Sequence, residues 1–147
     1  MIAIPRDIVE ELISHAKDEL PAEACGMLGG KSSRVVESYR LTNTDASSEH
    51  FSMSPAEQFA AVKKMRAQGL EMLAIYHSHP STPARMSDED LRMALTPGIR
   101  HIIISLADAA NPSVRGFVVN GGEPIEETIV VEEKHEFGTL HDSANCS

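Results

Sequence analysis

The chain has 147 residues and a formal net charge of −9, with aromatic residues at 4% of the sequence and no tryptophan. A chain of this size can bury one hydrophobic core without help from disulfide bonds. The excess of negative charge disfavours binding to nucleic-acid phosphates or anionic lipid, and few aromatic rings are present to stack on bases. We therefore expect a single domain with no nucleic-acid partner and no membrane partner.

Cysteine usage and apolar runs add a second constraint. The two cysteines, Cys25 and Cys146, lie far apart in the sequence and form no C-x-x-C pair. The sequence shows no signal-peptide pattern and no apolar run long enough to cross a membrane. These features predict a soluble protein of the reducing cytoplasm.

The pattern of apolar residues predicts helices that alternate with short strands. Prolines and glycines separate the segments, because proline cannot continue a helix and glycine favours turns. In chain order, the expected elements are a helix at 5–20, strands at 21–30 and 34–41, a helix at 55–69, a buried strand at 72–76, a helix at 87–95 and strands at 100–106, 114–119 and 125–131.

Two local patterns allow sharper predictions. We expect the pair Gly29–Gly30, together with Lys31–Ser32, to form the turn of a β-hairpin. Ser54 and Glu57 have the spacing of a capping box, in which a hydroxyl and a carboxylate each bind a backbone amide. Pro55 fits the first position of the helix that follows.

The C-terminal residues lose the periodic pattern. Residues 132–147 are acidic and contain few apolar side chains, so we expect a mobile tail that follows a domain of residues 1–131. The tail carries His135, His141 and Cys146, which are metal-ligand types whose role the sequence leaves open.

Potential metal ligands gather between His77 and Asp90, where a predicted strand ends and a helix begins. His77 and His79 are two positions apart, so an extended strand projects both imidazoles from one face. Asp90 supplies a carboxylate from the first turn of the helix. Two histidines and one carboxylate fill three positions of tetrahedral zinc and leave the fourth open to water, as in catalytic zinc sites.

Each half of this segment also has a simpler explanation. An isolated pair of histidines can be ordinary polar residues at the end of a strand. Ser87 and Asp90 have the spacing of a capping arrangement, in which side-chain oxygens bind amides of the first helical turn. Glu23 favours the catalytic interpretation, because a carboxylate near a zinc-bound water would complete its deprotonation at neutral pH.

Glu23, followed by His77-x-His79 and then by Ser87 and Asp90, resembles the JAMM motif of the MPN+ metalloproteases, and all five motif positions are filled. The resemblance implies one zinc ion per chain, held by His77, His79 and Asp90. It implies that Glu23 deprotonates the zinc-bound water and returns the proton to the leaving amine. Ser87 is then the hydrogen-bond donor to the oxyanion.

The resemblance covers roughly residues 4–131 and is nearest to the small stand-alone prokaryotic members. It implies a cytidine-deaminase-like α/β fold, with a curved mixed β-sheet flanked by about three helices in a single domain. It also implies hydrolysis of a peptide or isopeptide bond after the C-terminal diglycine of a ubiquitin-like or sulfur-carrier protein, of which we favour the sulfur carrier. Such a tail can add along a strand edge, with only glycines narrow enough to pass beside the zinc.

Three alternatives differ from this interpretation. A zinc deaminase needs an H-x-E sequence with P-C-x-x-C, and this sequence has neither. A RadC-like, DNA-associated member is disfavoured by the net charge and by the lack of a basic stripe. A non-catalytic MPN scaffold that binds partner proteins is the third alternative, but such proteins usually lack a motif residue and all five are present in this sequence. A purely structural zinc in this scaffold would need a fourth ligand from the tail.

Other polar residues are interpreted without a catalytic role. We expect His50, Ser78 and Arg85 at the rim of the cleft. Cys25 fits a small buried strand residue, since no dedicated base for a thiol is evident. His15 and His101 are interpreted as structural or solvated.

Overall fold

A computed structural model describes residues 1–94 and 97–133 of the chain, and the tail residues His135, His141 and Cys146 lie outside these ranges. None of the helices within the described residues is long and apolar enough to span a membrane. The elements, in chain order, are β1 (Ile2–Pro5), α1 (Arg6–Asp18), β2 (Cys25–Lys31), β3 (Arg34–Leu41), α2 (Pro55–Ala67), β4 (Glu71–His79), α3 (Asp88–Met93), β5 (Arg100–Ser105), β6 (Ser113–Asn120), β7 (Glu123–Glu127) and β8 (Ile129–Glu132).

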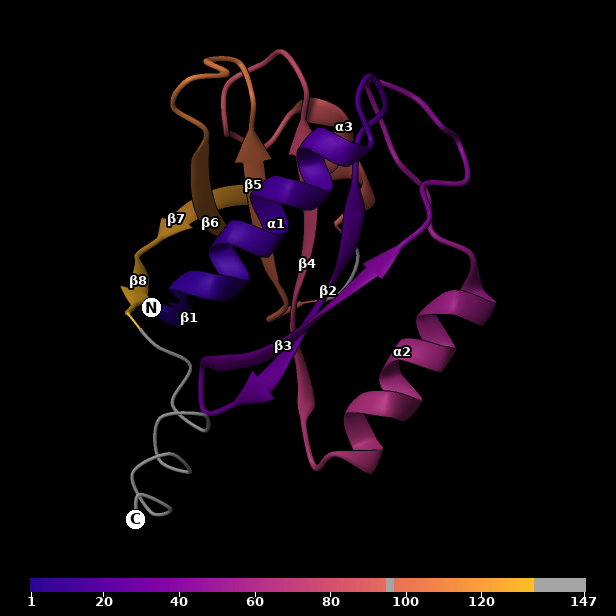
Figure 1. Cartoon of the computed structure of the whole chain (residues 1–147), viewed down its shortest axis with the longest axis vertical. Helices are drawn as coiled ribbons and strands as arrows, with labels where there is room; N and C mark the ends of the chain where they lie inside the picture. The colour runs from indigo at the N-terminus through magenta and orange to yellow at the C-terminus, as the bar shows by residue number, and fades with distance from the viewer. Residues whose placement is uncertain (95–96, 134–147) are drawn as a thin grey trace.

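The strands form one mixed sheet in the order β7-β6-β5-β4-β2-β3-β1-β8 (Figure 1). β4 pairs in parallel with β5, and β1 pairs in parallel with β3 and β8, whereas the other pairs are antiparallel. β7 and β8 lie at opposite ends of this order although only Thr128 separates them in sequence. The sheet is therefore curved and nearly closed, and the single strand predicted at 125–131 is in fact two.

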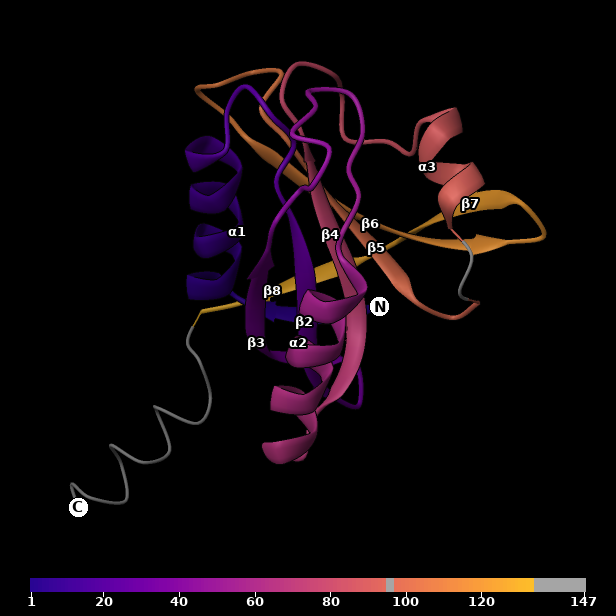
Figure 2. The same ribbon diagram turned by 90° about the vertical axis from the view of Figure 1, so that its right-hand side faces the viewer.

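The three helices within the described residues cover opposite faces of the sheet, because neighbouring residues of a strand point to opposite sides. On β2, Leu28 packs in the cluster that includes α1, and Met27 packs in the cluster that includes α2. On β5, Ile104 lies in the α1 cluster and Ile103 packs beside residues of α3. Figure 2 shows α1 on one side of the strands and α3 on the other. The expected curved mixed sheet with three helices is thus confirmed.

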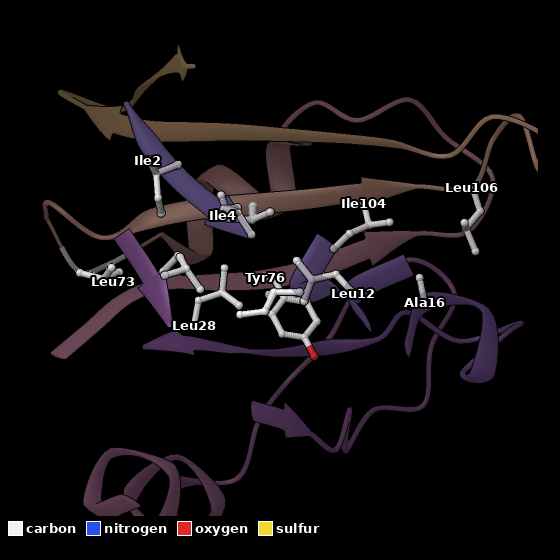
Figure 3. Packing of buried hydrophobic residues seen from close by; sticks show 13 residues of the cluster. Ile2, Ile4, Leu12, Ala16, Leu28, Leu73, Tyr76, Ile104 and Leu106 are labelled. Carbon is white, nitrogen blue, oxygen red and sulfur yellow. The ribbon is translucent and has the colours of Figure 1, made fainter. Parts of the chain in front are cut away.

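The main core lies between α1 and the sheet (Figure 3). It contains isoleucines of β1 and β5, Leu12 of α1 and the fully buried ring of Tyr76. The hydroxyl of Tyr76 lies 2.6 Å from Nδ1 of buried His15, so this polar group has a partner on the overlying helix. Of the two interpretations left open for His15, structural or solvated, its burial supports the structural one.

The N-terminus differs from the prediction by one strand. Residues Ile2–Pro5 are all buried and form β1, which is too short for periodicity to identify. Pro5 is the N-cap of α1 rather than a residue of its first turn. Because β1 leads directly into α1, the helix is fixed to the sheet at its first residue.

The hairpin between β2 and β3 turns at Ser32 and Ser33, whose φ angles are 51° and 63°. The glycines predicted for the turn belong to β2 instead. A Cβ on Gly30 would lie 2.0 Å from the carbonyl oxygen of Arg34, and a Cβ on Gly26 would lie 2.3 Å from that of Tyr39. These glycines allow close approach of the two strands rather than a reversal of the chain.

The predicted capping box of α2 is half formed. Ser54 is the N-cap and its hydroxyl accepts a hydrogen bond from the amide of Glu57, but the Glu57 carboxylate does not complete the box. It accepts instead from the amide and the hydroxyl of Thr42, at 2.8 and 2.9 Å. Glu57 therefore ties the start of α2 to the end of β3. Phe59 of α2 is 62% exposed.

Candidate active site

The two histidines of the predicted metal site lie at the C-terminal end of β4, a strand in the middle of the sheet. β4 is hydrogen-bonded on both sides, and His77 pairs with Cys25 of β2 and with Ile103 of β5. His77 and His79 are 1% and 5% exposed. Because neighbouring strands hold the backbone on both sides, the two imidazoles have well-defined positions.

Asp90 of α3 meets both histidines. Its Oδ1 lies 3.2 Å from Nε2 of His77, and its Oδ2 lies 3.1 Å from Nε2 of His79. The two Nε2 atoms are 3.2 Å apart. Three side chains that could bind a metal, two from a strand and one from a helix, thus lie together at one place.

Ser87 and Asp90 also form a complete capping box at the start of α3. The Asp90 amide donates to the Ser87 hydroxyl oxygen, and the Ser87 amide donates to Oδ2 of Asp90, both at 3.0 Å. The same Oδ2 is the atom nearest to His79. The capping explanation is therefore confirmed, and it is compatible with metal binding because the cap holds the carboxylate beside the histidines. The box uses the Ser87 oxygen as an acceptor, so its hydroxyl hydrogen can still be donated.

Burial and mutual contacts set the charges of this cluster. Burial lowers the pKa of His77, which favours the neutral imidazole that binds metals. Burial also acts to lower the pKa of His79, but its contacts with Asp90 and with the Pro83 carbonyl outweigh this effect and raise it. Burial acts to raise the pKa of Asp90, yet hydrogen bonds from both histidines hold it well below its usual value. Asp90 is therefore a carboxylate at neutral pH.

The donor set fits a zinc ion. Among the described residues, His77, His79 and Asp90 form a group whose potential ligand atoms all lie within 4.8 Å of one another. Ligand atoms around tetrahedral zinc are about 3.3 Å apart for bonds near 2.0 Å. The two Nε2 atoms are 3.2 Å apart, and each lies 3.1 to 3.2 Å from one oxygen of the Asp90 carboxylate, Oδ1 for His77 and Oδ2 for His79. Two imidazoles with one carboxylate are also the donors of known catalytic zinc sites.

Glu23 lies just before β2 and is 3% exposed. Within the described part of the chain its Oε1 has no hydrogen-bond partner. Burial raises its pKa to about 8, and the charges of His79 and Asp90 also act on it. A buried carboxyl with an unsatisfied oxygen and a pKa near neutrality has the properties of a group that exchanges a proton during catalysis.

Glu23 leads to a prediction about the pH dependence of stability in the metal-free protein. Its pKa is about 8 in the folded state, against an ordinary value of 4.5 in an unfolded chain, so between these values the folded protein retains a proton that the unfolded chain has lost. The free energy of unfolding should therefore fall as the pH rises through this window, by on the order of 4 kcal/mol. Urea unfolding at pH 5 and pH 8.5 checks this against Glu23→Gln, which should lack this contribution. Equal losses of stability in both proteins would contradict it.

A cavity of about 290 Å³ opens beside His77 and Asp90. Its walls come from the loop before α2, from β4 and β5 and from α3, which lie near one another at the end of β4 (Figure 1). The apolar part of the lining is formed by Phe51, Met53, Ile75, Met93 and Ile99. The cavity is therefore a largely apolar approach to the candidate metal site.

Two residues of this cavity were not predicted to take part in the site. The ring of Phe51 stacks on the imidazole of His77, with ring centroids 4.7 Å apart and an interplanar angle of 24°. His101, interpreted as structural or solvated, lines the cavity together with His50. Phe51 lies in a loop without periodic pattern, so no feature of the sequence could have identified its contact with His77.

The remaining polar residues are placed as follows. Ser78 is fully buried, not at the rim, and its hydroxyl accepts a 2.8 Å hydrogen bond from the amide of Ala24. Arg85 is exposed and lies beside a separate surface hollow. Cys25 is fully buried, and burial raises its pKa to about 12, which confirms it as an unreactive strand residue.

Comparison with known proteins identifies the family of this chain. Residues 5–118 match the family described as prokaryotic homologues of the JAB domain. The CysO-cysteine peptidase of Mycobacterium tuberculosis is 28% identical over 137 residues, which cover 92% of this chain and 94% of that protein. A probable TtuB-protein conjugate cleaving protease of Thermus thermophilus is 35% identical over 96 residues, 64% of each chain.

A solved structure shows the same fold. A protein from Desulfitobacterium hafniense is 45% identical to this chain and superposes with a TM-score of 0.87, covering 93% of this chain and 97% of that one. The matched family region contains strands β2 to β5 and all five motif residues. The chain therefore belongs to the prokaryotic homologues of the JAB domain, which confirms the resemblance to JAMM-motif proteins expected from its sequence.

Proposed function

We propose that this JAMM-type peptidase hydrolyses the bond after the C-terminal diglycine of a ubiquitin-like or sulfur-carrier protein, with His77, His79 and Asp90 holding a zinc ion. The observation that carries the proposal is the convergence of these three ligand atoms beside the buried, unsatisfied carboxyl of Glu23. The names of the two relatives, one a CysO-cysteine peptidase and one a conjugate-cleaving protease, support the substrate class.

The residues of the site divide the work of amide hydrolysis. When bound, zinc would polarise the scissile carbonyl and lower the pKa of a water molecule. Glu23 accepts the proton of the attacking water and then donates it to the leaving amine, which must be protonated to depart. The free hydroxyl hydrogen of Ser87 is donated to the oxygen that becomes negatively charged. The buried positions of Glu23 and the histidines exclude bulk water from these groups.

The cavity beside His77 suits an extended peptide tail. Its apolar wall would hold an aliphatic side chain of the substrate, and the buried cluster at its end leaves little room for side chains near the scissile bond. Glycine has no side chain to accommodate, so a diglycine terminus fits such an approach. These features support the tail specificity, whereas the carrier itself is to be identified by experiment.

The proposal is tested by incubating the zinc-loaded protein with ubiquitin-like and sulfur-carrier proteins that bear C-terminal extensions. We expect intact-mass spectrometry to show release of the extension immediately after the diglycine. A matched substrate with Gly-Gly replaced by Ala-Ala should remain uncut. Failure to cut any carrier, or cleavage at unrelated sites, would contradict the proposed substrate class.

Ser87→Ala should reduce kcat by roughly 10²–10³-fold, which is the usual cost of removing one oxyanion donor. The variant also loses the N-cap of α3, which costs about 1 kcal/mol of stability. Steady-state kinetics at saturating zinc separates the two effects, since a loss of stability alone leaves kcat of the folded fraction unchanged. A kcat within about threefold of the wild type would restrict Ser87 to its capping role.

A further inference from the structure

The two metal-site histidines are oriented by different means. Nδ1 of His79 donates to the carbonyl oxygen of Pro83 at 2.9 Å, the kind of hydrogen bond that usually orients a metal-binding histidine. Nδ1 of His77 is buried and has no hydrogen-bond partner among the described residues. The His77 ring is instead stacked against the ring of Phe51.

Phe51 is itself held by one buried side chain, Asn43, which is 7% exposed. The amide nitrogen of Asn43 donates to the carbonyl oxygen of His50 at 3.1 Å, and its oxygen accepts from the amide of Ser52 at 3.2 Å. These two residues flank Phe51 in sequence. One side chain therefore fixes the backbone on both sides of the stacked ring.

The same amide also reaches the candidate base. Nδ2 of Asn43 donates to the carbonyl oxygen of Glu23 at 3.1 Å, and the Glu23 amide donates to the carbonyl oxygen of Ser47 in the same loop at 2.8 Å. Two hydrogen bonds thus hold the backbone of Glu23, one on each side of its Cα atom. Asn43 makes one of them and also binds the backbone next to Phe51, whose ring stacks on His77.

We propose that Asn43 and Phe51 are positioning residues for the metal site: Phe51 replaces the missing orienting hydrogen bond of His77, and Asn43 sets the position of Phe51 and Glu23 together. This inference rests on the proposed metal-dependent function, but it concerns how the ligand and the base are held. Asn43 suits the task because its donor and acceptor face carbonyl oxygens on one side and amides on the other. An aspartate at this position would replace the donor Nδ2 by a carboxylate oxygen, which cannot donate to the carbonyl oxygens of Glu23 and His50.

The first arm of the test measures zinc affinity of the full chain, by competition with a chelating dye after removal of metal. Phe51→Leu should raise the Kd for zinc by roughly 10- to 100-fold, the usual effect of losing the group that orients a ligand. It should also shift the visible absorption bands of the cobalt-substituted protein. Phe51→Tyr retains the ring and should restore both values, and Phe59→Leu, at the exposed phenylalanine of α2, should change neither.

The second arm tests the connection through Asn43. Asn43→Asp should raise the Kd for zinc about as much as Phe51→Leu does. The Kd of the double variant should lie within about twofold of either single variant, because both changes remove the same constraint. The control Thr44→Val loses one hydrogen bond of the same loop, to the Ser52 carbonyl, and should retain zinc affinity. At saturating zinc, the kcat of Asn43→Asp should stay below that of the wild type, because Asn43 also positions Glu23. The kcat of Phe51→Leu should return to the wild-type value, because Phe51 acts only on the zinc ligand.

The outcomes separate this inference from the proposed function. A Phe51→Leu protein that binds zinc as tightly as the wild type, or additive losses in the double variant, would overturn it. Should Asn43→Asp not fold, the zinc Kd values of the Phe51 variants decide the role of the stacked ring. If the wild type binds zinc but cuts no carrier, the proposed substrate is wrong while the affinity measurements still decide the positioning role.

Discussion

Glu23→Gln is expected to abolish cleavage while zinc binding remains intact. The amide has nearly the same shape as the carboxyl but cannot accept a proton, so kcat should fall by at least about 10² and up to about 10⁴-fold, the range for loss of a general base. Glu23 is not one of the three clustered ligand atoms, so elemental analysis should still find one zinc ion per chain. The measurements are steady-state kinetics on a diglycine-extended carrier and zinc content of the same preparation.

The control for this variant is Glu19→Gln, a half-exposed glutamate at the C-terminal end of α1. It removes the same charge from the same region without entering the site, so its kcat should equal that of the wild type. Persistent turnover in Glu23→Gln would remove Glu23 as the proton acceptor. Loss of zinc from Glu23→Gln would instead make it a ligand.

Asp90→Ala is expected to lose zinc and all activity. The carboxylate contacts both imidazoles and its pKa is held well below the usual value, so it supplies the negative charge that balances a divalent cation. Removing it leaves two neutral histidines with no charged ligand, and zinc content should fall from one ion per chain toward zero. Elemental analysis after gel filtration gives this value directly.

Asp90 is also part of the capping box, so a separate variant must isolate the cap. Ser87→Ala removes the N-cap oxygen but leaves the carboxylate, and it should retain zinc. Asp88→Ala removes an exposed charge from the same helical turn and should retain both zinc and activity. Zinc loss in Ser87→Ala comparable to that in Asp90→Ala would mean that the order of α3, and not the carboxylate, determines binding.

The parts of the site that sequence could predict depend on local geometry. The alternation of a strand places His77 and His79 on one face, and the capping spacing places Ser87 against Asp90 within one helical turn. Both relations hold in the structure over a few residues. The proximity of Glu23 is not local, since its neighbour Ala24 is joined to Ser78 across the sheet. The chemistry of a zinc-bound water made Glu23 a candidate base, but its pairing with the histidines rested on the family resemblance.

The unpredicted features arise from contacts between distant segments. Closure of the sheet splits the last predicted strand, because β7 continues the β6 hairpin while β8 pairs with β1 from the other end of the chain. The glycines of β2 are needed because β3 and β4 lie too close to leave room for a Cβ atom. The periodicity of the sequence does not reveal this close approach. Likewise, Asn43 and Phe51 lie in a loop whose importance depends entirely on what their side chains contact.

Anomalous diffraction from crystals of the zinc-loaded full chain tests the proposed site most directly. We expect one zinc peak, bound by Nε2 of His77, Nε2 of His79 and the carboxylate of Asp90, with no fourth ligand from the protein. Such a site retains the open position that catalysis requires. A peak elsewhere, or a fourth ligand contributed by a tail residue such as His135, His141 or Cys146, would contradict a catalytic zinc at this cluster.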